Sequence, residues 1–130
     1  MSESKNERRM KAAHLRALRT ALGLSVKGLA DMLGHPNYSA MSWDTGRYYA
    51  PDEVVDDLEL LHAHTVRSVE DLAEHFREHG GPMVIPRSPA DLPWTVEGVD
   101  VPADVTLDWW KLVAVRVCEM VPGLRIEWPQ

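Results

Sequence analysis

The chain of 130 residues carries 14 basic and 20 acidic side chains, a formal net charge of −6, and is long enough to bury a hydrophobic core without disulfide or metal support. Its single cysteine excludes an intrachain disulfide, and no stretch reaches the roughly 18 consecutive apolar residues of a membrane-spanning helix. Because no apolar segment typical of a signal peptide follows the N-terminus, we expect a cytoplasmic protein with no membrane partner.

The charges are distributed unevenly along the chain. Residues 1–50 hold eight basic and four acidic side chains, a net +4, whereas residues 51–130 hold six basic and sixteen acidic ones, a net −10. Chance variation in composition is one explanation, but the contrast favours two regions with different roles. We therefore predict an N-terminal domain over residues 1–65 and an acidic, tryptophan-rich region over residues 66–130.

The first two helices are marked by apolar spacing and by residues that begin or end helices. Apolar side chains three and four positions apart predict an amphipathic helix over residues 7–22, which Gly23 ends. Ser25 is a suitable N-cap for a second, short helix, which Gly34 closes.

The third predicted helix, over residues 36–45, has an unusual composition. Ala40 and Trp43 are spaced to be buried on one side, and Gly46 ends the helix. The other positions form a mixed polar and aromatic face, made by Asn37, Tyr38, Ser39, Met41 and Ser42. Such a face has no role in a core and indicates contact with something outside the chain.

Two more helices are expected before residue 80. Pro51 opens the fourth, with Asp52 and Glu53 in its first turn, where the helix dipole favours negative charge. The motif Ser-Val-Glu-Asp at residues 68–71 resembles a capping box and predicts the start of a fifth helix, which Gly-Gly-Pro at residues 80–82 ends.

The remaining sequence predicts a small α/β unit. Residues 83–85 and 124–128 have strand character, while residues 107–120 show both helical and alternating spacing. We favour a helix there because Thr106 is a suitable N-cap. Since residues 15–46 have the layout of a helix-turn-helix, the predicted fold is mainly α, a five-helix helix-turn-helix domain with a strand-helix-strand extension.

About half of the chain resembles the Cro/CI (XRE) family of repressors. The matching segments are LRALRTALGLSVKGLADMLG and SWDTGR, which follow the family pattern Leu-x-x-Leu-Arg, Gly-Leu-Ser, Leu-Ala-x-x-Leu-Gly and Trp-Glu-x-Gly-Arg without an insertion. The resemblance implies that the third helix enters the major groove of double-stranded DNA and presents its mixed face to base edges.

The resemblance also implies which residues contact DNA. The expected base contacts are Asn37, Tyr38, Ser39, Met41 and Ser42, with Asn37 at a position where the family commonly carries an amide that reads adenine. The expected phosphate contacts are Ser25, Lys27, Thr45 and Arg47, which give affinity without sequence information. Arg8, Arg9 and Lys11 are candidates for a basic arm.

Three residues of the motif are expected to brace the fold. Trp43 belongs to the core, and Arg19 is expected to pair with Asp44, which replaces the glutamate common in the family. For Asn37, the alternative to base reading is a side chain bonded to the backbone at its own helix start.

Regulators of this type usually bind palindromic operators as homodimers. We predict that Trp109, Trp110 and Trp128 form the dimer contact, because aromatic residues are favoured in interfaces, while a purely core role is the alternative. The order of a helix-turn-helix, a strand, a tryptophan-containing helix and a last strand is loosely similar to phage anti-CRISPR-associated autoregulators, which implies autoregulation.

Metal and catalytic sites find less support. His62 with His64, and His75 with His79, are candidate metal ligands, but neither pair has a carboxylate or cysteine placed to complete a site, so we expect no metal and no other cofactor. We expect no enzyme, because no phosphate-binding loop or nucleophile motif is present and Cys118 lies in an apolar run where a thiol is usually inert.

The sequence therefore predicts a DNA-binding transcriptional regulator, a dimeric repressor that reads its operator through the third helix. The alternative is an antitoxin-like or adaptor protein whose acidic C-terminal half binds a protein partner.

Overall fold

The protein is described by a computed structural model that covers residues 10–130. The chain divides into two compact units, Met1–His62 and Ala63–Gln130. Within the described residues, no helix combines the length and apolar character that crossing a bilayer requires.

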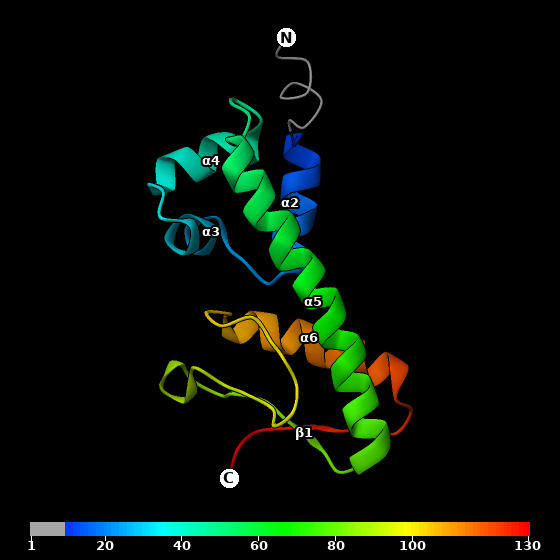
Figure 1. Cartoon of the computed structure of the whole chain (residues 1–130). Helices are drawn as coiled ribbons and strands as arrows, with labels where there is room; N and C mark the ends of the chain where they lie inside the picture. The colour runs from blue at the N-terminus through cyan, green and yellow to red at the C-terminus, as the bar shows by residue number, and fades with distance from the viewer. Residues whose placement is uncertain (1–9) are drawn as a thin grey trace. The chain divides into compact units, whose positions relative to one another are not determined.

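In the described part of the first unit, α-helices are the only regular secondary structure. It contains α2 (Ala12–Ala21), α3 (Val26–Leu33), α4 (Asn37–Thr45) and the beginning of α5 (Asp52–His79) (Figure 1). The first three correspond to the helices predicted up to residue 45, although α2 begins later than expected and residues 7–9 of that prediction lie outside the described part.

The ends of α3 and α4 follow from individual residues. The Oγ of Ser25 accepts a hydrogen bond from the backbone N of Gly28 at 2.9 Å, so Ser25 is the predicted N-cap of α3. Gly34 and Gly46 end α3 and α4 in the left-handed conformation, with φ of 71° and 86°. A side chain would strain both positions, which explains why both helices end at glycine.

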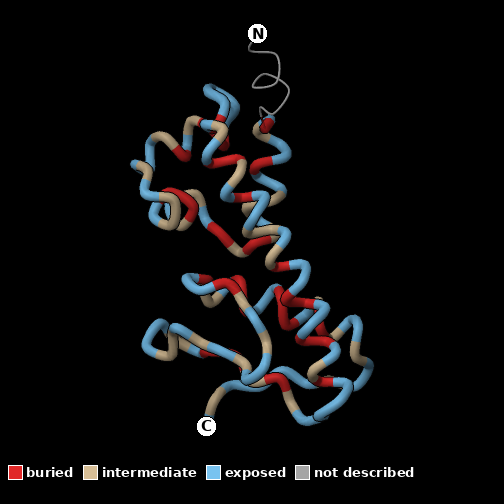
Figure 2. The backbone as a smooth tube through the Cα atoms, in the orientation of Figure 1, coloured by how far each residue is buried: buried red, intermediate tan, exposed pale blue. Residues whose placement is uncertain are grey.

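One apolar core holds the first unit together. It is built by inward-facing positions of all four helices and their connections, namely Met10, Leu15, Leu22, Leu24, Leu29, Ala30, Ala40, Trp43, Ala50, Val54, Val55 and Leu58. The buried positions recur at intervals along each helix (Figure 2), as amphipathic helices require. Both predicted inward residues of α4, Ala40 and Trp43, belong to this core.

The predicted fourth and fifth helices are one continuous helix, α5. The expected cap at Ser68 is wrong, because its buried Oγ donates to the carbonyl of His64, four residues earlier, at 2.9 Å. A serine that bonds back in this way stays inside a helix. No glycine or proline interrupts the chain between Pro51 and Gly80, so nothing forces a break.

The second unit contains a small parallel sheet. Strands β1 (Met83–Val84) and β2 (Ile126–Glu127) pair in parallel, with the 3₁₀ helix η1 (Pro89–Asp91) and the helix α6 (Leu107–Met120) between them (Figure 1). Parallel neighbours need a long crossover connection, and α6 lies within it. The predicted strand-helix-strand order is confirmed, in a chain whose described part is mainly helical.

Residues 107–120, whose spacing fits both a helix and a strand, form a helix, as we predicted. The Oγ1 of Thr106 accepts from the backbone N of Trp109 at 3.0 Å and caps α6. Val113 and Val117 are buried whereas Val115 is exposed, which is the period of a helix and not the alternation of a strand. Residues 10–130 therefore contain five α-helices, α2 to α6. The prediction placed five helices in the N-terminal domain, whereas α6, one of the five observed, belongs to the C-terminal extension.

Candidate nucleic-acid interface

Four side chains of α4 are exposed to solvent: Asn37, Tyr38, Met41 and Thr45, which we call the α4 face. The first three are predicted base contacts, and Thr45 is a predicted phosphate contact. Asn37, Met41 and Thr45 are four residues apart and therefore lie along one side of the helix. Ser39 and Ser42, also predicted as base contacts, are half-buried at the margin of this face.

Hydrogen bonds within α4 distinguish the polar residues. The Oγ of Ser42 donates to the Ser39 carbonyl at 2.6 Å, and the Oγ1 of Thr45 donates to the Ser42 carbonyl at 3.3 Å. The Nδ2 of Asn37 donates to the sulfur of Met41 at 3.6 Å. Since Pro36 is the N-cap and Asn37 makes no capping bond, the alternative in which Asn37 bonds its own helix start is not what the structure shows.

Asp44 fixes α4 from its buried side. Its Oδ1 accepts from the Nε of Arg19 at 2.9 Å, and its Oδ2 accepts from the Nε of Arg16 at 3.1 Å. Arg19 also donates to the carbonyl of Leu24 at 2.8 Å, and Arg16 donates to the Asp44 carbonyl at 3.0 Å. The predicted Arg19–Asp44 pair is confirmed, and α4 is tied to α2 through two arginines.

Sequence reasoning missed Arg16. It stands three residues before Arg19, so both guanidinium groups reach one side of α2. The three-residue spacing is the sequence signal that Arg16 can reach the same partner as Arg19. Because Asp44 is one carboxylate, the sequence offers no reason to expect that it pairs with both arginines. Asp44 carries one charge against two, so this cluster leaves one net positive charge beside α4.

The predicted phosphate contacts lie at the start of α3 and at the end of α4. Ser25 and Lys27 are exposed there, but the Nζ of Lys27 is 2.7 Å from the carboxylate of the exposed Asp31, so its charge is shared. Arg47 is exposed just after α4, with its guanidinium 5.5 Å from the ring centre of Tyr48. Arg8 and Arg9 of the predicted arm lie outside the described residues, while Lys11 is exposed.

A group of exposed aromatic side chains was also missed. All three tyrosines of the chain, Tyr38, Tyr48 and Tyr49, fall between residues 38 and 49 and are at least half exposed. An amphipathic aromatic residue on the surface beside cationic side chains is typical of binding surfaces. The signal was the Arg-Tyr-Tyr sequence that directly follows the α4 motif.

The tryptophans predicted for dimerisation divide into two groups. Trp109 and Trp110 are 1% and 0% exposed, and their rings meet edge to face with centres 4.9 Å apart. Trp109 also donates from Nε1 to the Oγ1 of Thr65 at 3.0 Å. These two residues build the core of the second unit and have no surface for a partner, which corrects the prediction. Trp128 alone is exposed, at 46%.

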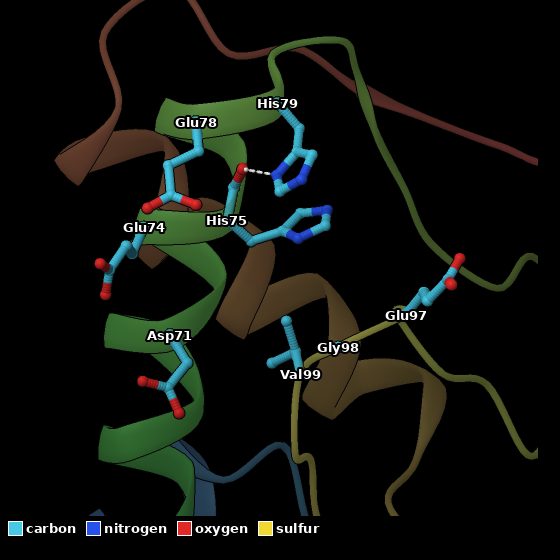
Figure 3. Close-up of a pocket in the computed structure, with 8 residues that line it drawn as sticks. All are labelled: Asp71, Glu74, His75, Glu78, His79, Glu97, Gly98 and Val99. Carbon is cyan, nitrogen blue, oxygen red and sulfur yellow. Dashed lines mark hydrogen bonds between the residues drawn. The ribbon is translucent and has the colours of Figure 1, made fainter.

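The histidine pair His75 and His79 lines an acidic hollow of about 700 Å³ in the second unit (Figure 3). The two rings stack with centres 4.4 Å apart, and the Nδ1 of His79 is 2.9 Å from the His75 carbonyl oxygen. Within residues 10–130, no group of three or more histidine, cysteine or acidic side chains is placed to hold a metal ion.

Cys118 is half-buried in α6, and its Sγ lies 3.5 Å from the carbonyl oxygen of Leu124. Burial raises the pKa of this thiol above its usual range, because a thiolate is poorly solvated there. A raised pKa lowers the fraction of reactive thiolate, in line with the inert thiol expected from the sequence.

No family model matches the chain, and no curated protein is found as a relative.

Proposed function

We propose that the protein is a sequence-specific DNA-binding regulator of transcription that acts as a dimer and reads bases through the α4 face. The observation that carries this proposal is the exposed row of Asn37, Met41 and Thr45 on a short helix whose other side is buried and ion-paired. Because the inner side of α4 is fixed by packing and ion pairs, little conformational entropy is lost when its outer face binds a partner. The width of the major groove admits such a helix.

The chemistry of the α4 face fits base edges. The amide of Asn37 can offer a donor and an acceptor together, the pair that adenine presents in the major groove. Met41 and the ring of Tyr38 supply apolar surface suited to the methyl group of thymine. The weak sulfur contact of Asn37 is readily exchanged for bonds to a base, since sulfur is a poor acceptor.

The charge of the segment that holds α2, α3 and α4 supports the same proposal. Residues 10–50 carry five basic and two acidic side chains, a net +3, whereas the beginning of α5, in the same unit, adds five acidic side chains within residues 52–59. Positive charge close to the α4 face attracts phosphates and adds affinity on any sequence. The acidic second unit repels the same phosphates, which favours binding through the positive segment of residues 10–50.

The proposal is tested by selecting a preferred site from a random duplex library with the purified chain and then measuring affinities by fluorescence anisotropy. Asn37→Ala is expected to cost about 1–3 kcal/mol on the selected site and little on scrambled DNA. Arg47→Ala should weaken binding to both DNAs similarly, because phosphates carry no sequence information.

Lys111→Ala serves as the matched control, since Lys111 is an exposed cation of the second unit that pairs with Asp108 at 3.6 Å. It removes the same charge as Arg47→Ala and should leave DNA affinity unchanged. Equal losses for Asn37→Ala on selected and scrambled DNA would contradict base reading by this residue.

A second candidate function is binding of a basic protein partner through the acidic unit. Asp71, Glu74 and Glu78 are exposed along α5 beside the hollow of Figure 3, where Glu97 also contributes a carboxylate. If the library yields no enriched sequence, and affinity for DNA is weak and uniform, this second function is favoured over the first.

A further inference from the structure

The two outer edges of the small sheet differ in a way that points to a partner. On β1, the carbonyl of Val84 accepts a hydrogen bond from the Nε1 of Trp94 at 3.1 Å, so the outward acceptor of that edge is already used. Met83 and Ile85 beside it are buried. On the other side of the sheet no third strand pairs with β2 within the described residues, and residues 125–128 are all exposed.

The backbone of β2 offers hydrogen bonds at its open edge. The carbonyls of Arg125 and Glu127 face β1, where they accept from Met83 at 2.8 Å and from Ile85 at 3.0 Å. Successive residues of a strand point their N–H and C=O groups to opposite sides. The N–H and C=O of Ile126 therefore point away from β1, toward the position that an added strand would take.

The sequence of this edge is complementary to itself when two copies run antiparallel. Residues 124–128 read Leu-Arg-Ile-Glu-Trp. With Ile126 opposite Ile126 of a second copy, Arg125 stands opposite Glu127 of that copy, and Leu124 stands opposite Trp128. Both charges are then paired and all apolar residues face apolar residues, which is the arrangement that stabilises adjacent strands.

The side chains on this edge are available for such pairing. Arg125 and Glu127 are 77% and 45% exposed and lie 3.5 Å apart on one face of β2, as residues two apart on a strand do. Ile126 and Trp128 lie on the other face and are exposed to a similar degree. Large exposed apolar side chains next to an open strand edge are costly unless something covers them.

We propose that the protein dimerises by antiparallel pairing of the β2 edge with the β2 edge of a second copy, centred on Ile126. In this register the two Ile126 residues exchange both of their outward backbone hydrogen bonds. The inference deepens the proposed function, on which its role in operator binding rests, by naming the surface that joins two protomers. The pairing itself requires no DNA.

Charge reversal tests the register. Arg125→Glu and Glu127→Arg each give a homodimer edge with like charges opposite one another, and each should weaken self-association roughly tenfold or more in sedimentation velocity at low salt. An equimolar mixture of the two variants restores both opposite-charge pairs across the interface. We expect the mixture to form a heterodimer and the double variant to dimerise like the natural chain.

Rescue in the mixture cannot come from an effect on folding, because each variant lacks the intrachain Arg125–Glu127 pair equally. Ile126→Pro is the complementary variant: it removes a donor at the open edge but none that bonds β1, so far-UV circular dichroism should be unchanged while the dimer is lost. A natural chain that sediments as a monomer, or a mixture that stays monomeric, would overturn the proposal. Because DNA is absent from these measurements, a dimer that selects no DNA sequence would refute the proposed function alone.

Discussion

Asp44 shows how one residue type at one position determines both the placement and the exposure of α4. Its carboxylate is buried at the foot of the helix and is shared by two arginines of α2. A buried carboxylate needs such partners, since burial of an unpaired charge is costly. The exposed residues on the opposite side of α4 are therefore not needed to hold the helix in place, and their side chains can serve in binding.

Removing this carboxylate should destabilise the first unit. Asp44→Ala leaves the half-buried guanidinium of Arg19 unpaired, and we expect a loss of about 2–3 kcal/mol in the free energy of unfolding. Arg16→Ala is the comparison, because its side chain is 58% exposed against 15% for Arg19, and it should cost less than about 1 kcal/mol. Urea denaturation followed by circular dichroism measures both; equal losses would contradict this account.

Cys118 gives a second expectation at the residue scale. Because burial raises the pKa of its thiol, a smaller fraction is thiolate at pH 8 than in a free cysteine. Reaction with a chromogenic disulfide reagent at pH 8 should therefore be slower for the folded chain than for glutathione, and should accelerate in urea. Equal rates for the folded chain and glutathione would show that burial does not protect the thiol.

At the scale of elements, the sequence predicts helix ends better than helix continuity. Gly34 and Gly46 can adopt a left-handed conformation at low cost, so a local signal was sufficient for both ends. Ser68 is ambiguous, because the same hydroxyl caps one helix or bonds back within another, and only the surrounding packing decides. Aromatic content likewise does not separate a core from an interface: Trp109 and Trp110, which the sequence predicts as dimer contacts, are buried core residues.

The continuity of α5 is testable at a single position. Val66 is 41% exposed in the middle of the helix, so Val66→Pro removes a backbone hydrogen bond and clashes with the preceding turn at a position outside the buried core. We expect a loss of about 3 kcal/mol or more in stability and a reduced helical signal at 222 nm. Val66→Ala is the control and should change little. A proline tolerated at residue 66 would favour two separate helices.

At the scale of the whole molecule, the charge changes sign within the first unit. Residues 1–50 are net positive and residues 51–130 are net negative, and the negative part begins with the first turns of α5, before the boundary between the units at residue 62. The proposed DNA contacts of α4 all lie in the positive part. The sequence alone gave this contrast and the layout of the first unit. The self-complementary edge of β2 could not be predicted in this way. The sequence Leu-Arg-Ile-Glu-Trp indicates a pairing surface only once the structure shows which edge of the strand has no neighbour.

Salt dependence should separate the two kinds of DNA contact. Binding through phosphates releases counterions, so the logarithm of affinity is expected to fall linearly with the logarithm of salt concentration. Arg47→Ala should reduce the magnitude of that slope by about one, whereas Asn37→Ala should lower affinity without changing it. Anisotropy titrations over a salt series give both values. A change of slope for Asn37→Ala would assign that residue to the backbone instead of the bases.

The indole of Trp94 has a consequence for how large an assembly can grow. Parallel sheets with two open edges can add copies without limit and form fibres. Here Trp94 bonds the outward carbonyl of Val84 on the β1 edge, and the proposed pairing of β2 with its own copy uses the other edge. In the proposed dimer, both β2 edges are used and the outward carbonyl of each Val84 is already bonded to Trp94. We therefore expect association to stop at two protomers and Trp94 to oppose the addition of further strands at β1.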